Sequence, residues 1–252
     1  RYADVTTVAL SAPNEETLAD FVGDLHAEAE RQYPSTATLT GEHTLHRIKN
    51  AASPRLDEPV SFEFNPGGAF GRSRVVSTRN VIDFDPRDVP TIEKRTAERS
   101  STASRLWYGF KRQLLLSVPG AVRRRLRQST SSKYERLEAA DTLLFLVPIP
   151  ELVREEPFPV DGDETAWFDR PDYVAVFDDL CEAYSVDGTK QARVVATGAG
   201  AALHCYDGSS VTDSKYAEFL RRGLDLNVHT RVVPVDASEG DRQGFSPLLR
   251  EL

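Results

Sequence analysis

The chain has 252 residues, of which 40% are hydrophobic and 28% charged, and its formal net charge is −8. This composition is that of a globular protein, and no apolar run approaches the roughly 18 residues of a membrane span. Two cysteines, Cys181 and Cys205, exclude a disulfide scaffold and indicate a reducing, cytoplasmic compartment. We expect no signal peptide, because the first residues lack a basic region followed by an apolar one.

Arginine outnumbers lysine by 25 to 6, and methionine is absent. An acidic, arginine-rich composition is similar to that of halophilic or archaeal proteins, and a GC-rich genome in an ordinary host is the alternative. Because even the first residue is not methionine, we expect an excised domain or a processed fragment. The acidic balance argues against nucleic acid as the main partner.

The first part of the chain predicts a strand, two helices and a hairpin. Val5–Leu10 is a short strand, and apolar residues at helical spacing follow over Leu18–Ala29. A second, shorter helix is expected over Glu42–Ala52. Val60–Phe64 alternates like a strand, and Arg74–Phe84 reads as the strand that returns after a turn of Asn, Pro and Gly. These two strands predict an antiparallel hairpin.

The last part of the chain alternates strands with helices. Leu143–Val147 is continuously apolar, which is typical of a strand buried on both faces of a parallel sheet. A helix over Asp172–Tyr184, a strand over Arg193–Thr197, a helix over Asp213–Arg222 and a strand over Arg231–Val235 follow. The order predicts an α/β fold, a three-layer sandwich with a mostly parallel central sheet and one antiparallel hairpin.

This order of elements resembles a GTPase domain of the P-loop NTPase class, in the translation-factor and Ras-related group. The resemblance covers nearly the whole chain as one domain, residues 1–252. Such a domain carries G-x-x-x-x-G-K-[ST] after its first strand, where backbone N–H groups, lysine and a hydroxyl hold phosphates and Mg²⁺. The motifs of the family are degraded in this chain, so the resemblance implies a pseudo-GTPase.

The phosphate-loop window begins at Leu10. Thr17 matches the hydroxyl that coordinates Mg²⁺, but Leu10 and Glu15 stand at the glycine positions and Glu16 at the lysine position. A second alignment starts a shortened loop at Ser11. We expect Asn14 to cap the helix, with two carboxylates in its first turn. Each carboxylate would repel phosphate by about 4 kcal/mol at about 4 Å and an effective dielectric of about 20. A simple, well-capped helix is the plain interpretation and is compatible with the resemblance.

The later motifs of the family are altered at their expected places. Asp83 matches the Mg²⁺-binding Asp of D-x-x-G, while Pro86 replaces its Gly and has no N–H for a γ-phosphate. The base-reading [NT]-K-x-D corresponds to the segment from Thr197 to Gly200, which lacks both Lys and Asp. The final S-A-x loop corresponds to Asp236–Ser238, where only the alanine is retained.

A basic insertion over about residues 95–138 interrupts this acidic chain. Between Arg105 and Arg136 basic residues alternate with aromatic and aliphatic ones against a single acid, Glu135. The segment is interpreted as a solvated face, a surface that docks a protein, or a surface for an anionic membrane or nucleic acid. The candidate partner-binding residues are Arg112, Arg123, Arg124, Arg125 and Arg127.

Other polar groups give weaker signals. His204 and Cys205 are too isolated to predict a metal site. His43 and His46 are expected on a surface helix, and Asp178 and Asp179 are expected to face solvent.

Three functions follow from these patterns. The first is a catalytically inactive GTPase-like module that binds or regulates a protein partner, such as an active GTPase or a larger assembly, without cofactor or metal. The second is an atypical active GTPase that would bind GTP and Mg²⁺ through Thr17 and Asp83. The third is a module that binds an anionic surface through the basic segment. A membrane surface is one such partner, and nucleic acid is less favoured by the net charge.

Overall fold

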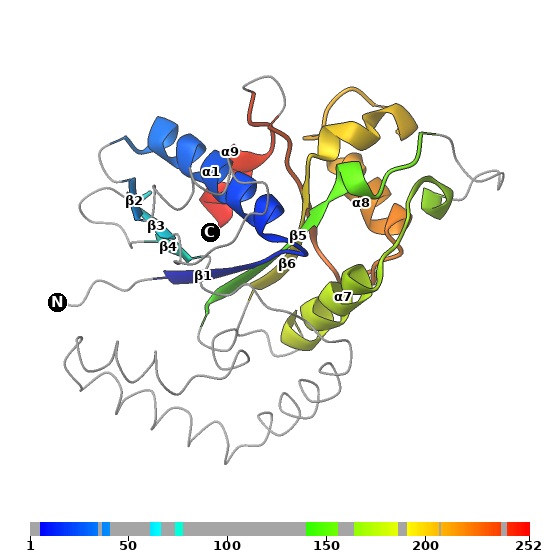
Figure 1. Ribbon diagram of the computed structural model, residues 1–252, viewed down its shortest axis with the longest axis horizontal. Coiled ribbons are helices and arrows are strands. Elements are labelled where there is room, and N and C mark those ends of the chain that lie inside the picture. The colour runs from blue at the N-terminus through cyan, green and yellow to red at the C-terminus, as the bar shows by residue number, and fades with distance from the viewer. Residues whose placement is uncertain are drawn as a thin grey trace, which may run out of the picture.

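The computed structural model describes residues 6–34, 37–40, 61–66, 74–77, 140–155, 164–185, 191–206, 208–237 and 241–252. These residues build a mixed α/β fold around one seven-stranded sheet, with strand order β2-β3-β4-β1-β5-β6-β7 (Figure 1). The predicted helix over 42–52, most of the returning strand after residue 77 and the whole insertion over 95–138 lie outside the described residues.

The parallel part of the sheet is centred on β1 (Thr6–Ser11) and β5 (Thr142–Pro148). β6 (Gln191–Thr197) and β7 (Val232–Pro234) continue it beyond β5, all parallel. All seven residues of β5 are buried, so the prediction of a strand covered on both faces is confirmed.

The antiparallel part lies on the other side of β1. There β4 (Arg74–Ser77) runs parallel to β1 and antiparallel to β3 (Ser61–Phe64), which confirms the predicted hairpin. A third strand, β2 (Thr38–Thr40), pairs antiparallel with β3. The prediction of a single antiparallel hairpin therefore missed one strand, β2, because a three-residue strand is too short to show an alternating pattern.

Helices cover both faces of the sheet (Figure 1). On one face, α1 (Glu15–Gln32) and α9 (Phe245–Glu251) pack in a single apolar cluster with alternate residues of β1 and β5. On the other face, α7 (Asp172–Ser185) and α8 (Ser214–Gly223) pack with the remaining residues of β5 and with β6. Alternation along each strand sends successive side chains to opposite clusters.

The sequence analysis missed several short elements. They are α9 and three 3-10 helices: η3 (Ile149–Glu151), η4 (Glu164–Trp167) and η5 (Ala199–Cys205). Helices of this length show too few turns for a periodic pattern to stand out. Within the described residues, none of the helices combines the length and the apolar character needed to cross a membrane.

The chain order places a topological switch point between β1 and β5. The strands after β1 first fill one side of it, as β2 to β4, and then the other side, as β5 to β7. The helix that follows β1 covers one face of the sheet, and the helix that follows β5 covers the opposite face. In open α/β sheets the carboxyl ends of the two strands at such a point are where ligands bind.

Candidate functional site at the switch point

The turn from β1 into α1 is three residues long: Ala12, Pro13 and Asn14. Asn14 has an extended backbone, and its side-chain oxygen accepts a hydrogen bond from the Thr17 N–H at 2.8 Å. The predicted N-cap is therefore confirmed. Pro13 has no N–H, so this turn offers few free donors to an anion.

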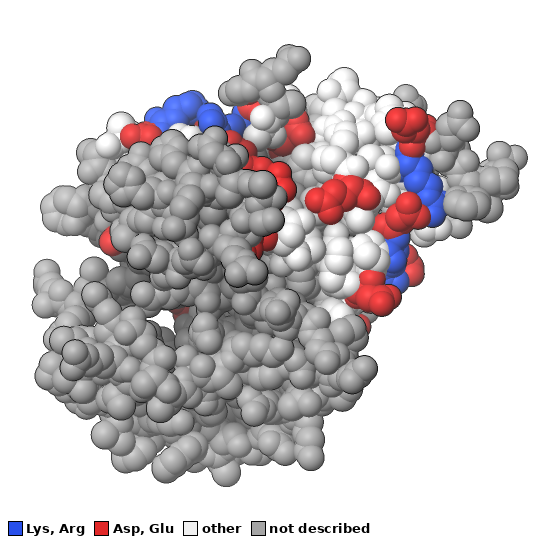
Figure 2. Space-filling view, viewed as in Figure 1, with Lys and Arg blue, Asp and Glu red and all other residues white. Residues whose placement is uncertain are grey.

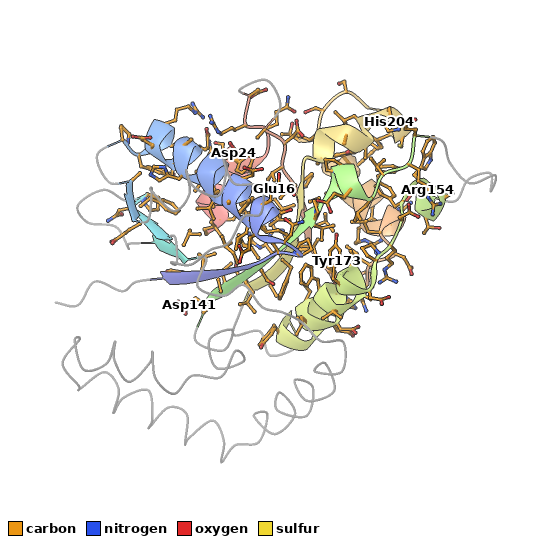
Figure 3. The ribbon with its side chains drawn as sticks, in the orientation of Figure 1. Glu16, Asp24, Asp141, Arg154, Tyr173 and His204 are labelled. Carbon is orange, nitrogen blue, oxygen red and sulfur yellow. The ribbon has the colours of Figure 1, made fainter. Side chains whose placement is uncertain are left out.

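The first turn of α1 carries the two carboxylates that the sequence predicts. Glu16 is exposed, and Glu15 and Thr17 are half-buried. Carboxylates at a helix N-terminus offset the partial positive charge that would otherwise attract an anion. Figure 3 labels Glu16 on α1 and Tyr173 at the start of α7, on either side of the carboxyl ends of β1 and β5.

Ser11, the last residue of β1, is 1% exposed, and its Oγ has no hydrogen-bond partner among the described residues. Leu10 packs under α1, so alternation turns Ser11 toward the α7 face, beside its register partner Phe145. The ring of Phe145 lies 5.0 Å from that of Phe177, which lies 5.6 Å from that of Tyr173. The Tyr173 hydroxyl is also buried, and the part of the chain that the structure describes offers it no hydrogen-bond partner.

Glu151 lies close to these residues, on the segment that follows β5. It is the last residue of η3, and its carboxylate is exposed. The Asn14 amide donates to its Oε1 at the long distance of 3.5 Å. Burial and the nearby Glu151 carboxylate raise the pKa of the Tyr173 phenol well above its usual value, so the hydroxyl stays neutral. We call Ser11, Asn14, Glu151 and Tyr173 the switch-point site.

The segment predicted to correspond to a base-reading loop packs against other parts of the chain. Thr197 donates from Oγ1 to the Val147 carbonyl at 3.4 Å. Gly198 has φ of +60°, and a Cβ there would lie 2.7 Å from Pro150 Cγ, so the chain after β6 packs tightly on the chain after β5. The Gly200 N–H, near the start of η5, donates to Asp236 Oδ1 at 3.0 Å.

Asp236 is the first residue of the segment expected to match the S-A-x loop. It is buried, and it joins the chain after β7 to η5 through Gly200. A Cβ on Gly200 would lie 2.8 Å from this carboxylate, so glycine is needed for the contact. The sequence analysis matched the two segments to separate motifs, and the structure brings them into direct contact through Gly200 and Asp236.

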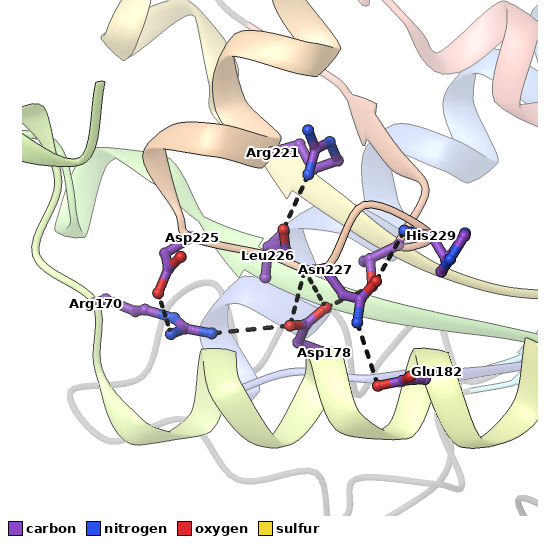
Figure 4. A network of polar contacts seen from close by, with 9 residues as sticks. Arg170, Asp178, Glu182, Arg221, Asp225, Leu226, Asn227 and His229 are labelled. Atoms are coloured by element: carbon purple, nitrogen blue, oxygen red, sulfur yellow. Dashed lines mark hydrogen bonds and ion pairs between the residues drawn. The ribbon is translucent and has the colours of Figure 1, made fainter. Parts of the chain in front are cut away.

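The prediction that Asp178 faces solvent is wrong, whereas Asp179 is exposed as expected. Asp178 lies on α7 and accepts two 3.0 Å hydrogen bonds from the Asn227 N–H and one from Thr230 Oγ1 (Figure 4). Arg170 lies 3.9 Å from it. The carboxylate holds the turn between α8 and β7, whose residues are distant in sequence and therefore invisible to a local pattern.

No three His, Cys, Asp or Glu side chains in the described part of the chain gather as a metal site. His204 and Cys205 do touch, with 3.1 Å between Nε2 and Sγ. Burial raises the pKa of Cys205 to about 11, so its thiol is protonated at neutral pH and is a weak nucleophile.

Several predicted site residues cannot be placed. Asp83, Pro86, Ser238 and the histidines 43 and 46 lie outside the described residues, as do the candidate partner-binding arginines 112, 123, 124, 125 and 127. Conversely, the sequence analysis did not single out Glu151 or Tyr173. Glu151 has one sequence signal, its position three residues after the buried strand that ends at Pro148, and Tyr173 has only its place at the start of a predicted helix.

Comparisons with known proteins identify no family. No family model matches the chain, and no curated protein matches it. Among solved structures, the S-adenosylhomocysteine nucleosidase from Streptococcus pyogenes in complex with 5-methylthiotubericidin is 8% identical, over 92% of this chain and 75% of that one. The TM-score of this match is 0.20, and we draw neither fold nor function from it.

Proposed function

We propose that this chain is a catalytically inactive GTPase-like domain that acts as an interaction or regulatory module in the cytoplasm. The arrangement of the sheet supports this proposal. An antiparallel unit beside β1, then parallel β5, β6 and β7 with helices on both faces of the sheet, agrees with the order of elements in the GTPase class. Their carboxyl ends meet at one edge, where a nucleotide would bind in a fold of this kind.

One observation carries the inactive part of the proposal: the turn between β1 and α1 is filled by the chain itself. Its three residues are too few to match the phosphate-wrapping loop of G-x-x-x-x-G-K-[ST]. Asn14 already occupies the Thr17 N–H, and Glu15 and Glu16 bring negative charge where phosphate needs positive charge.

The segments after β6 and β7 also support an inactive domain. Gly200 and Asp236 are bonded to each other, and Gly198 is pressed against Pro150. An active domain would keep a lysine and a carboxylate free to contact the base at the first of these segments. Here the polar groups hold the loops together. This arrangement favours a scaffold for protein contacts rather than a nucleotide-binding site.

A titration of the full chain with fluorescent GTP and Mg²⁺ tests the proposal. We expect no saturable change in fluorescence across the micromolar range, and the same result with Thr17→Ala. Micromolar binding that Thr17→Ala abolishes would overturn the proposal in favour of an active GTPase. Release of inorganic phosphate from GTP, followed in parallel, would do the same.

A further inference from the structure

We draw no further inference here: the strongest candidate, the acidic surface around the first turns of α1 and α7 (Figure 2), carries nothing, because it is a cluster of carboxylates and the neighbouring Ser11 and Tyr173 hydroxyls are too buried for a ligand to reach.

Discussion

The switch-point site and the turn between α8 and β7 treat their buried polar groups in opposite ways. At the turn, the Asp178 carboxylate accepts hydrogen bonds from Asn227 and Thr230 and lies near Arg170, which also reaches Asp225 at 2.9 Å (Figure 4). At the switch point, the buried hydroxyls of Ser11 and Tyr173 have no hydrogen-bond partner among the described residues. The hydrogen bonds of the first region are complete within the chain, and those of the second are not.

This difference separates a completed network of hydrogen bonds from buried hydroxyls that the described residues leave without a partner. A buried polar group without a partner costs about 1–3 kcal/mol, so a fold normally completes such groups internally. Asp178 shows that this chain does so even where the partners lie far away in sequence. Among the described residues, two of the four buried side-chain atoms without a hydrogen-bond partner, in Ser11 and Tyr173, lie at the edge where an open α/β sheet binds ligands, and the other two belong to Glu164 and Arg242.

The largest effect is expected at Asp178. Asp178→Ala leaves the Asn227 N–H and the Thr230 hydroxyl without their acceptor, and we expect a loss of about 3 kcal/mol in the free energy of unfolding. Urea denaturation measures it. Asp179→Ala, on the exposed side of the same helix, is the control and should change stability by less than about 0.5 kcal/mol. Similar losses for both variants would remove the distinction between the two carboxylates.

Two tyrosines on neighbouring helices give the most direct comparison. Tyr216 is fully buried and its hydroxyl donates to the Ala199 carbonyl, so Tyr216→Phe should cost about 1–2 kcal/mol of unfolding free energy. Tyr173→Phe removes a hydroxyl that has no partner among the described residues and should cost nothing or stabilise slightly. Thermal and urea denaturation of both variants measure the difference. A larger loss for Tyr173→Phe would contradict the absence of a partner for its hydroxyl.

A smaller effect is expected at the start of α1. Asn14→Ala removes the cap on the Thr17 N–H and should lower stability by about 1 kcal/mol. Asn14→Asp keeps a side-chain oxygen at the cap and should retain most of that stability. The two variants are compared in urea denaturation. If Asn14→Ala is neutral, then the turn between β1 and α1 is not held by its cap.

The smallest effect is expected at Glu28 on α1, another carboxylate that accepts hydrogen bonds from within the chain. Hydrogen bonds from Arg31, and also from Gln32, hold the pKa of Glu28 below its usual value of 4.5. A carboxylate with a lowered folded pKa stabilises the protein above the unfolded pKa, and this stability is lost as the pH falls below 4.5 toward the folded value. Stability measured against pH should therefore fall less steeply below 4.5 in Glu28→Gln than in the unchanged chain. Identical slopes would contradict the pairing.

Much of the fold could be predicted because it follows from local patterns of residues. The helical spacing from Leu18 to Ala29 predicts α1, the apolar run from Leu143 to Val147 predicts β5, and Asn14 before two glutamates predicts a capped start. Each pattern needs only residues within a few positions of one another. α9 contains apolar residues at helical spacing as well, but seven residues that include Pro247 are too few to indicate a helix.

Only the part of the candidate site that follows β1 could be predicted from the sequence. The residues from Ser11 to Thr17 follow from the motif window, but Glu151 and Tyr173 belong to a segment that the sequence presents as a polar, proline-rich loop and the start of a helix. They join the site because β5 pairs with β1 and Phe145 and Phe177 connect the sheet to α7. Sequence spacing contains no information about that pairing.

The sequence by itself determined the elements, their alternation and the negative charge at the start of α1, since periodicity, capping and charge are properties of neighbouring residues. Only the tertiary structure decided which polar groups are satisfied. Asp178 has its partners 49 and 52 residues away, whereas Ser11 Oγ has none in the part of the chain that the structure describes. Burial and hydrogen bonding depend on which residues the fold brings to a side chain, and for this reason Asp178 and Ser11 could not be distinguished in these terms from the sequence.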